Sequence, residues 1–330
     1  MYVGYILTPL VSICCLTYNH GVYIRDAIEG FLIQKTTFPF EILIHDDASI
    51  DNTAQIIREY ELQYPHLIFP IYQKENQYSK GRRLTLRFNV TRARGKYIAL
   101  CEGDDYWTDP YKLQKQVDFL ETNPEYGLCY TSAKVFVQKT STFSKTVIGS
   151  PVESFEELLL KPGIVTLTTV FRRAYCEGYS SEVLPYSTNW KMGDYPLWLY
   201  IATKSKMKFM EDITATYRML EESASRSKSF DHNLDFANSA FEIRNFFADK
   251  FHVSDTIRKQ YSLDYFCDVL SLAFLVNRTE LINQAKLFFE VNKLNVFRSF
   301  LTLFKIFRNN RFAHRVLNHF MNRYKLSWYK

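Results

Sequence analysis

The chain has 330 residues, of which 47% are hydrophobic and 16% aromatic, while glycine and proline number only 11 and 10. This composition excludes collagen-like and low-complexity proteins and suffices for one large α/β domain with an appended piece. The net charge of +6 belongs to the C-terminus, because residues 291–330 hold nine Lys or Arg and no Asp or Glu, so nucleic-acid binding is not expected.

The first segment, from Tyr2 to Leu16, is apolar enough to suggest a signal peptide or a membrane anchor. No Lys or Arg precedes it, Pro9 interrupts it, and it is too short to span a bilayer. Residues 11–16 run directly into a polar motif, as a buried parallel strand does before a ligand-binding loop, so we interpret them as the first core strand. Six cysteines without C-x-x-C or metal-ligand spacing predict reduced, buried thiols and a cytoplasmic protein.

Strands and helices are predicted to alternate through the first 125 residues. The predicted strands are 11–16, 41–45, 68–72 and 97–101, and the predicted helices are 22–34, 53–64, 84–94 and 111–121. This alternation implies right-handed crossovers and a parallel sheet that binds ligands beyond the carboxyl ends of its strands. Extended segments at 128–137 and 165–171 suggest antiparallel additions to the sheet, and the spacing from about Asp231 onward is helical.

Three of these predicted strands end in polar motifs: Thr17-Tyr18-Asn19, Asp46-Asp47 and Glu102-Gly103-Asp104-Asp105. The carboxylates of the third motif can hold a divalent cation against a diphosphate, and its glycine allows close approach of backbone. A solvated turn that caps the next helix is the alternative. The carboxylates of the second motif can accept hydrogen bonds from a pyrimidine N–H or a ribose hydroxyl, or can simply cap the helix at Thr53.

The first motif offers Tyr18 as a stacking platform for a nucleobase and backbone groups near Thr17 for contacts with it. An ordinary turn is equally compatible with these residues. Three polar strand ends in this order at one edge of a sheet nevertheless favour a nucleotide site over independent accidents.

Residues 11 to about 225 resemble glycosyltransferase family 2, the inverting enzymes of the GT-A fold, a Rossmann-like mixed sheet flanked by helices. The resemblance rests on residues 11–19, on residues 45–53 and on Ala93-Arg94-Gly95-Lys96-Tyr97-Ile98 before residues 102–105. It implies a catalytic domain at 1–228 and a helical, basic extension at 229–330. It also implies that Asp46 and Asp47 hold uracil or another base, Asp104 the ribose region, and Asp105 a divalent cation, Mg²⁺ or Mn²⁺.

The resemblance further implies a general base, which takes the proton of the acceptor hydroxyl. Asp194, before an apolar helix at 197–202, fits that place, although it could be only an N-cap. Arg218 resembles the region that closes over the phosphates, and Arg87 is taken for the diphosphate, although Arg82 and Arg83 are equally placed. Two aromatic residues beside the catalytic motifs are candidates for the acceptor side, Trp107 and Tyr195.

The C-terminal tail interleaves aromatic and basic residues between Phe297 and Arg311. It is either a basic amphipathic stretch that binds anionic lipid at the inner face of the plasma membrane, or a packed helical cap. The whole pattern predicts sugar transfer from a nucleotide sugar, with UDP favoured, to a saccharide or lipid-linked saccharide in polysaccharide synthesis. The alternatives are a nucleotidyltransferase of similar fold and a non-catalytic adaptor that docks at membranes.

Overall fold

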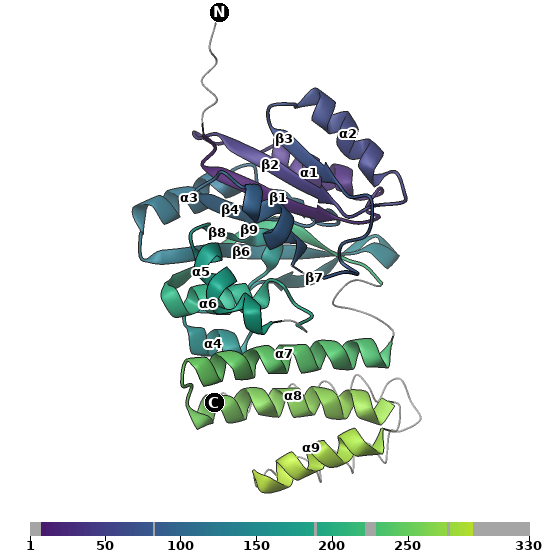
Figure 1. Cartoon of the computed structure of the whole chain (residues 1–330), viewed down its shortest axis with the longest axis vertical. Helices are drawn as coiled ribbons and strands as arrows, with labels where there is room; N and C mark the ends of the chain where they lie inside the picture. The colour runs from purple at the N-terminus through teal and green to yellow at the C-terminus, as the bar shows by residue number, and fades with distance from the viewer. Residues whose placement is uncertain (1–7, 82, 188–189, 222–228, 276–277, 293–330) are drawn as a thin grey trace, which may run out of the picture. The chain divides into compact units, whose positions relative to one another are not determined.

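The computed structural model describes residues 8–81, 83–187, 190–221, 229–275 and 278–292. The chain divides into two compact units, Met1–Glu221 and Glu222–Lys330. The first unit is a nine-stranded sheet with helices packed against it, and the described part of the second unit is helical (Figure 1).

The first part of the sheet is parallel, as predicted, with β1 between β2 and β4 and with β3 at the edge. Its elements are β1 (Val11–Thr17), α1 (Ile24–Leu32), β2 (Phe40–Asp46), α2 (Thr53–Gln63), β3 (Ile68–Tyr72), β4 (Tyr97–Leu100) and α3 (Lys112–Thr122). Strands β1, β2 and β4 are buried almost throughout, which explains their continuous apolar sequences. Because these strands are parallel, their carboxyl ends meet at one edge of the sheet.

The second part of the sheet mixes directions, and the strand order is β3-β2-β1-β4-β8-β6-β9-β5, with β7 beside β6. These strands are β5 (Tyr106–Trp107), β6 (Tyr126–Val137), β7 (Thr142–Ile148), β8 (Val170–Arg172) and β9 (Lys206–Met219). The predicted antiparallel additions are confirmed for β8, which runs antiparallel to β4 and β6. They are confirmed for β6 as well, which runs antiparallel to β7 and β8, while its other neighbour β9, which was not among the predicted additions, pairs with it in parallel. The crossover between them contains α4 (Phe155–Leu160), α5 (Tyr175–Glu182) and α6 (Tyr195–Lys204).

The helix predicted at 84–94 is present, but it is a π-helix at Thr85–Asn89 followed by a 3-10 helix at Val90–Arg92 and not an α-helix. Asn89 Nδ2 donates to the carbonyl of Cys15 at 3.0 Å, and Arg92 donates to carbonyls of β2 and β3 at 3.0 and 2.7 Å. These hydrogen bonds attach the π-helix and the 3-10 helix to the sheet. Similarly, the extended segment expected at 165–171 is a 3-10 turn at Thr166–Thr168 followed by β8.

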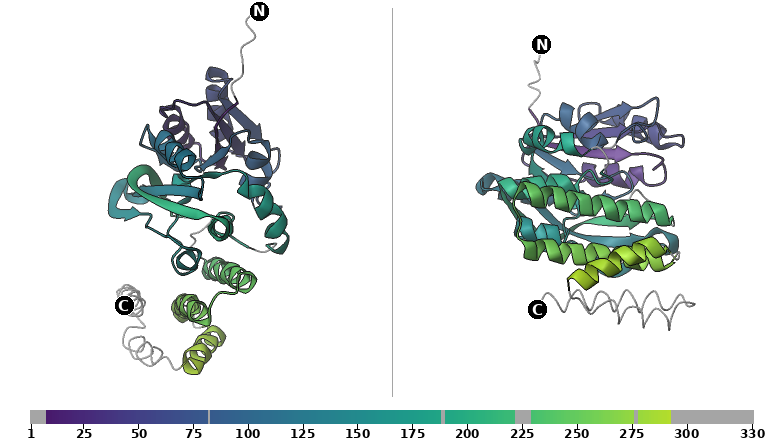
Figure 2. Two further views of the ribbon diagram at one scale, coloured as in Figure 1. Left: turned by 90° about the vertical axis from the view of Figure 1, so that its left-hand side faces the viewer. Right: turned by 60° about the horizontal axis from the view of Figure 1, so that its bottom comes forward.

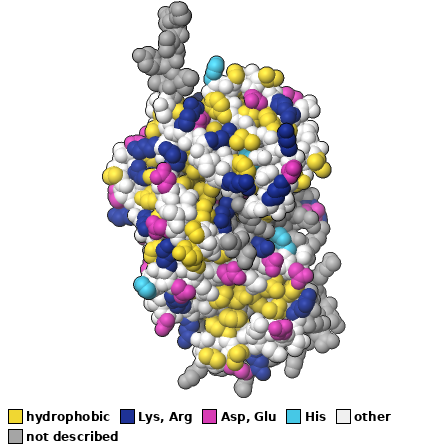
Figure 3. All heavy atoms as spheres, in the orientation of Figure 1, with side chains coloured by type: hydrophobic (Ala, Val, Ile, Leu, Met, Phe, Trp, Pro, Cys, Tyr) yellow, Lys and Arg dark blue, Asp and Glu magenta, His cyan; other side chains and the backbone are white. Residues whose placement is uncertain are grey.

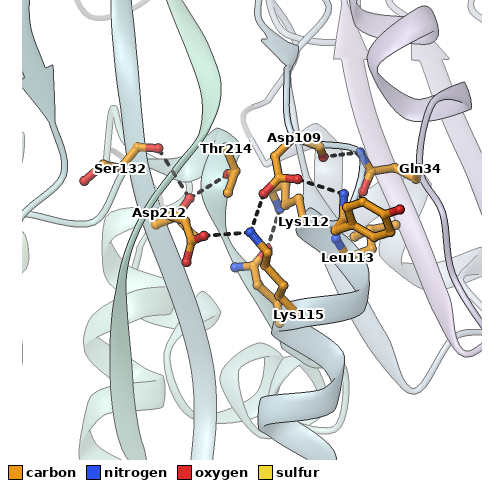
Figure 4. Close-up of polar contacts among 11 residues, drawn as sticks. Gln34, Asp109, Lys112, Leu113, Lys115, Ser132, Asp212 and Thr214 are labelled. Carbon is orange, nitrogen blue, oxygen red and sulfur yellow. Dashed lines mark hydrogen bonds and ion pairs between the residues drawn. The ribbon is translucent and has the colours of Figure 1, made fainter.

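The segment after β4 is fixed by contacts with α1, α3 and β9. A Cβ at Gly30 would lie 2.8 Å from the backbone nitrogen of Trp107, so α1 packs directly on β5. Figure 4 shows Lys115 between two carboxylates, with its Nζ 2.8 Å from Asp109 and 2.7 Å from Asp212. Gln34 Nε2 donates to the carbonyl of Asp109 at 2.8 Å. The residues between β4 and α3 are therefore held in place by three surrounding elements.

The second unit contains α7 (Phe230–Lys250), α8 (Asp255–Leu275) and α9 (Thr279–Val291), which lie side by side in sequence order (Figure 2) and confirm the predicted helices. Stacked rings join neighbouring helices, with centroids 4.1 Å apart for Phe241 and Tyr265 and 4.3 Å apart for Phe266 and Phe288. No helix among the described residues is both long and apolar enough to cross a membrane. The predicted basic tail, 297–311, lies outside the described residues.

Two predictions from composition can be compared with the structure. All six cysteines are buried, as expected. Acidic and basic side chains are interspersed over the face shown in Figure 3, which agrees with the nearly balanced charge of the first 290 residues.

Candidate active site

The three polar strand ends converge. The amide of Gly103 donates to the carbonyl of Leu16 at 2.8 Å, and the amide of Asp47 donates to the carbonyl of Thr17 at 2.9 Å. The end of β1 is thus bonded directly to the residues that follow β2 and β4. A single site formed by all three ends, which the spacing of the motifs predicts, is present.

The residues after β4 form an acidic turn (residues 102–105). Glu102, Asp104 and Asp105 each offer one carboxylate oxygen, and these oxygens lie within 4.8 Å of one another. The Glu102 side chain is exposed, and desolvation by the protein around its carboxylate, together with the charges of Asp104 and Asp194, raises its pKa. Burial and the charge of Asp104 also raise the pKa of Asp105. Mutual repulsion of this kind is relieved by a cation.

The donor set fits a hard divalent cation. Carboxylate oxygens are the ligands that Mg²⁺ and Mn²⁺ prefer in proteins, and one or two protein carboxylates suffice for Mg²⁺ when a diphosphate supplies further oxygens. Asp104 Oδ1 is buried and has no hydrogen-bond partner among the described residues. An unpaired buried acceptor beside two other carboxylates is a place where a cation or a ligand hydroxyl would be stabilised.

Four buried polar atoms at the converging strand ends have no hydrogen-bond partner in the described part of the chain: Thr17 Oγ1, His20 Nδ1, Asp46 Oδ1 and Asp104 Oδ1. A buried polar group without a partner destabilises a protein by about 1–3 kcal/mol. Folded chains rarely concentrate such groups at one place unless a ligand satisfies them. The arrangement indicates a polar ligand at this edge of the sheet.

His20 is a site residue that the sequence motifs did not reveal. Its Nδ1 lies 4.0 Å from Asp104 Oδ1, and burial lowers its pKa despite the nearby carboxylates. A Cβ at Gly103 would lie 2.7 Å from Thr17 Oγ1 and 3.0 Å from His20 Nδ1, so this glycine lets the acidic turn pack against both side chains. The only signal in the sequence is its position directly after the Thr17-Tyr18-Asn19 motif.

The two aspartates after β2 have different surroundings. Both oxygens of Asp47 accept backbone N–H groups, from Gln77 at 2.7 Å and Tyr78 at 3.0 Å, so Asp47 fastens the loop after β3. Asp46 is hydrogen-bonded by Ser49, whose amide donates to it at 3.3 Å, and its Oδ1 has no partner among the described residues. Burial raises the pKa of Asp46. Of the two, Asp46 therefore keeps more capacity to accept a hydrogen bond from a ligand.

The other two residues of the first motif also have distinct roles. Tyr18 is 43% exposed, so its ring has a free surface for stacking. Asn19 has a positive φ of 54° and is bonded to the loop after β2, because its amide donates to Ser49 Oγ and its Oδ1 accepts from the amide of Ile50, both at 2.9 Å. Asn19 thus holds two of the converging loops together.

Asp194 is the N-cap of α6 and lies near the acidic turn. One oxygen accepts the amide of Tyr195 at 2.7 Å, and the other accepts the hydroxyl of Thr166. Its charge contributes to the raised pKa of Glu102, which places it within electrostatic range of that carboxylate. Its role as the general base remains a prediction, and its capping contacts do not exclude it.

The predicted basic residues are distributed differently from expectation. Arg87 is exposed, whereas Arg83 donates to the carbonyl of Ser187. Arg82 lies outside the described residues. Arg218 is 7% exposed and is bonded to protein groups, so it lies beneath the acidic turn and not on an open surface where a diphosphate could reach it.

The two aromatic candidates for the acceptor side are buried. Trp107 is 2% exposed, and its Nε1 donates to the carbonyl of Leu167 at 2.7 Å. Tyr195 is 5% exposed, and its hydroxyl donates to the carbonyl of Leu158 at 3.1 Å. Both side chains pack inside the protein, so the structure does not support contact of either one with an acceptor.

Comparisons with known proteins give consistent results. The family model described as glycosyl transferase family 2 matches residues 12–183, which is more than half of the chain. The uncharacterized protein Rv1520 of Mycobacterium tuberculosis is 42% identical over 166 residues, and the match covers 49% of this chain and 47% of that protein. This chain therefore spans about half the length of that curated relative.

A second relative and one solved structure extend the match. The Escherichia coli UDP-Glc:alpha-D-GlcNAc-diphosphoundecaprenol beta-1,3-glucosyltransferase WfaP is 28% identical over 220 residues, which are 66% of this chain and 81% of that protein. The mannosyltransferase PcManGT from Pyrobaculum calidifontis, solved with GDP-Man and Mn²⁺, superposes with a TM-score of 0.59 at 14% identity. That superposition covers 96% of this chain and 85% of PcManGT, and it shows a shared fold, the GT-A-like mixed sheet flanked by helices.

Proposed function

Because the chain belongs to glycosyl transferase family 2, a family of inverting glycosyltransferases, we propose that it transfers a sugar from a nucleoside diphosphate sugar to a hydroxyl of a growing glycan. UDP is the nucleotide we favour, and a saccharide or lipid-linked saccharide of a cell-surface polysaccharide is the acceptor. The name of WfaP, a relative that uses UDP-glucose and a diphosphoundecaprenol-linked acceptor, supports both choices.

One observation carries the proposal. Four polar atoms without partners among the described residues lie at the meeting point of β1, β2 and β4, and one of them belongs to Asp104, which with Glu102 and Asp105 fits a divalent cation. A nucleoside diphosphate presents the matching groups: N–H donors on the base, hydroxyls on the ribose and anionic oxygens on the diphosphate. In this proposal Asp46 accepts from the base, Tyr18 stacks on it, and Thr17, His20 and Asp104 contact the ribose region.

The reaction then requires a proton acceptor and a stabilised leaving group. The acceptor oxygen bonds to the anomeric carbon as the bond from that carbon to the diphosphate breaks, and the carboxylate of Asp194 takes the hydroxyl proton. Asp105 holds the cation, Mg²⁺ or Mn²⁺, which neutralises charge on the departing diphosphate when bound. The Mn²⁺ in PcManGT supports a cation of this kind. Arg87, which is exposed, is the basic residue we assign to the diphosphate.

The proposal assigns catalysis to residues 1–228 and a supporting role to the helical, basic region 229–330. Nine basic and no acidic residues in 291–330 favour attachment to an anionic membrane surface at the inner face of the plasma membrane, where lipid-linked acceptors are found. Binding to vesicles with and without anionic lipid tests this part. Equal binding to both kinds of vesicle would contradict it.

A screen of nucleotide sugars tests the function itself. The protein is incubated with UDP-, GDP- and dTDP-sugars, with saccharide and lipid-linked acceptors, in the presence of Mg²⁺, Mn²⁺ or a chelator. We expect release of UDP from a UDP-sugar that depends on an acceptor and is lost with the chelator. Release of pyrophosphate from a nucleoside triphosphate, without free nucleoside diphosphate, would instead identify a nucleotidyltransferase.

A further inference from the structure

Arg218 makes polar contacts with the acidic turn, with α1 and with Gln138, which follows β6. Its Nε donates to the carbonyl of Asp104 at 2.8 Å, and one Nη donates to Asp26 Oδ2 at 2.7 Å. The other Nη donates to Gln138 Oε1 at 3.1 Å. Its backbone amide donates to Asp105 Oδ1 at 2.7 Å. One residue of β9 therefore binds both the backbone and a carboxylate of the acidic turn.

Three aromatic rings enclose the guanidinium. The distances from its central carbon to the ring centroids are 4.8 Å for Tyr23, 5.2 Å for Tyr106 and 5.7 Å for Phe136. A cation shielded from water in this way must be compensated by hydrogen bonds and a counter-charge. The carboxylate of Asp26, whose side chain is 55% exposed, supplies that charge from the first turn of α1.

We propose that Arg218 and Asp26 form a clamp, the Arg218–Asp26 clamp, that holds the acidic turn in the shape that binds the cation of the nucleotide complex. The inference rests on the proposed function. It replaces the expected contact of Arg218 with diphosphate by a positioning role: Arg218 acts through Asp104 and Asp105. The backbone amide of Arg218 fixes the orientation of the Asp105 carboxylate and leaves its other oxygen for the cation, while the guanidinium holds the turn through the carbonyl of Asp104.

The fork of the guanidinium explains why the residue is arginine. Its planar N–H groups reach the turn and α1 at the same time, whereas a lysine ammonium is a point charge that can satisfy only part of this set. Because β9 and α1 are regular elements, the clamp ties the turn to rigid parts of the first unit. The turn is then preorganised before any ligand arrives.

Binding of Mn²⁺ in the presence of excess UDP, followed by electron paramagnetic resonance of free Mn²⁺, tests the clamp without relying on turnover. We expect Arg218→Lys to weaken Mn²⁺ binding about tenfold, since hydrogen bonds to charged groups contribute about that much. Asp26→Asn, which removes only the counter-charge, should weaken it by a smaller factor. In both variants the KM for the nucleotide sugar should be raised at low Mn²⁺ and should approach that of the wild type at saturating Mn²⁺.

Arg94→Lys is the matched control, because Arg94 also pairs with a buried carboxylate, Glu41, at 2.7 Å, but at the amino ends of the strands. It should lower stability and leave Mn²⁺ affinity unchanged, which separates positioning from a general loss of stability. Wild-type Mn²⁺ affinity in Arg218→Lys overturns the clamp. If that variant does not fold, wild-type affinity in Asp26→Asn overturns it. Absence of Mn²⁺ binding by the wild type would instead refute the proposed function, and the clamp with it.

Discussion

Buried polar groups at the two ends of the parallel strands differ in their hydrogen bonding. At the amino ends, Ser12 Oγ donates to Glu41 at 2.7 Å and accepts the amide of Gly95 at 2.9 Å. Arg94 donates to the same glutamate through its amide and its Nε, both at 2.8 Å. At the carboxyl ends, four buried polar atoms lack hydrogen-bond partners in the part of the chain that the structure describes. At the amino ends these groups bond to one another, whereas at the carboxyl ends several donors and acceptors remain available to a ligand.

This difference separates stability from function within one sheet. Groups that are satisfied internally contribute to folding, whereas groups left without a partner reduce stability until a ligand arrives. Substitutions at the amino ends should therefore lower the free energy of unfolding while having little effect on the affinity for the ligand. Substitutions at the carboxyl ends should lower the affinity for the ligand while having little effect on the free energy of unfolding.

Asp194→Asn should show the largest effect. Loss of a general base lowers rates by about 10²–10⁴-fold, whereas asparagine caps a helix about as well as aspartate, so stability should be nearly unchanged. Initial rates of nucleoside diphosphate release, together with the thermal unfolding midpoint, measure both quantities. A folded variant with full activity would remove Asp194 from the role of base.

Glu41→Ala should have the opposite profile. It leaves Ser12 and Arg94 without their shared partner, and we expect it to lower the free energy of unfolding by about 2–3 kcal/mol. Urea denaturation followed by circular dichroism gives this value, and titration with UDP should give an unchanged affinity. Glu41→Gln, which keeps the shape but not the charge, should lose less. A large loss of UDP affinity in folded Glu41→Ala would contradict the separation of the two ends.

The parts of the site that were predictable from sequence are those encoded locally. Apolar runs followed directly by Thr17, Asp46 and Glu102 mark strand ends, and the pleated, parallel geometry then forces those ends together. The N-cap position of Asp194 was predictable in the same way, because an acidic residue directly before an apolar helix favours capping it, whereas its role as base rests on the family resemblance and stays a prediction.

The remainder depends on contacts between distant residues. Arg218 and Asp26 are 192 positions apart, so no local pattern could distinguish a buried clamp from a phosphate contact. The π-helix at 85–89, where an α-helix would be the local preference, also depends on a distant contact, since Asn89 donates to the carbonyl of Cys15, 74 positions away. The parallel pairing of β6 and β9 requires a crossover of short helices with weak sequence patterns. In each case tertiary hydrogen bonds or packing override local preference.

Lys112 offers a third test, because it is buried near the acidic turn but makes its contacts with protein. Its Nζ donates to Gln116 at 2.7 Å and lies 4.3 Å from the ring of Trp107, and burial lowers its pKa to about 7. The unfolded chain keeps this lysine protonated up to about pH 10. Above pH 7 the unfolded state therefore binds more protons than the folded state, so stability should rise with pH.

Urea denaturation at pH 7.0 and 8.0 measures this slope, and comparison with Lys112→Met cancels the contribution of the cysteines, which also titrate in the unfolded chain. The wild type should gain up to about 1.4 kcal/mol over this unit of pH relative to Lys112→Met, in which the gain should disappear. The same slope in both proteins would show that Lys112 stays charged in the folded state.

Thr17→Val is the smallest change and the sharpest test of the open end. The hydroxyl it removes is buried and has no partner among the described residues, so stability should be unchanged or higher by up to about 1 kcal/mol, while UDP affinity should fall by about threefold to tenfold. Thr131→Val is the matched control, since the Thr131 hydroxyl lies 2.7 Å from that of Thr214 in the core. The control should lose about 1 kcal/mol of stability and keep its UDP affinity. If both substitutions instead destabilise the protein equally and leave UDP binding intact, the unpartnered hydroxyl at the end of β1 does not belong to a nucleotide site.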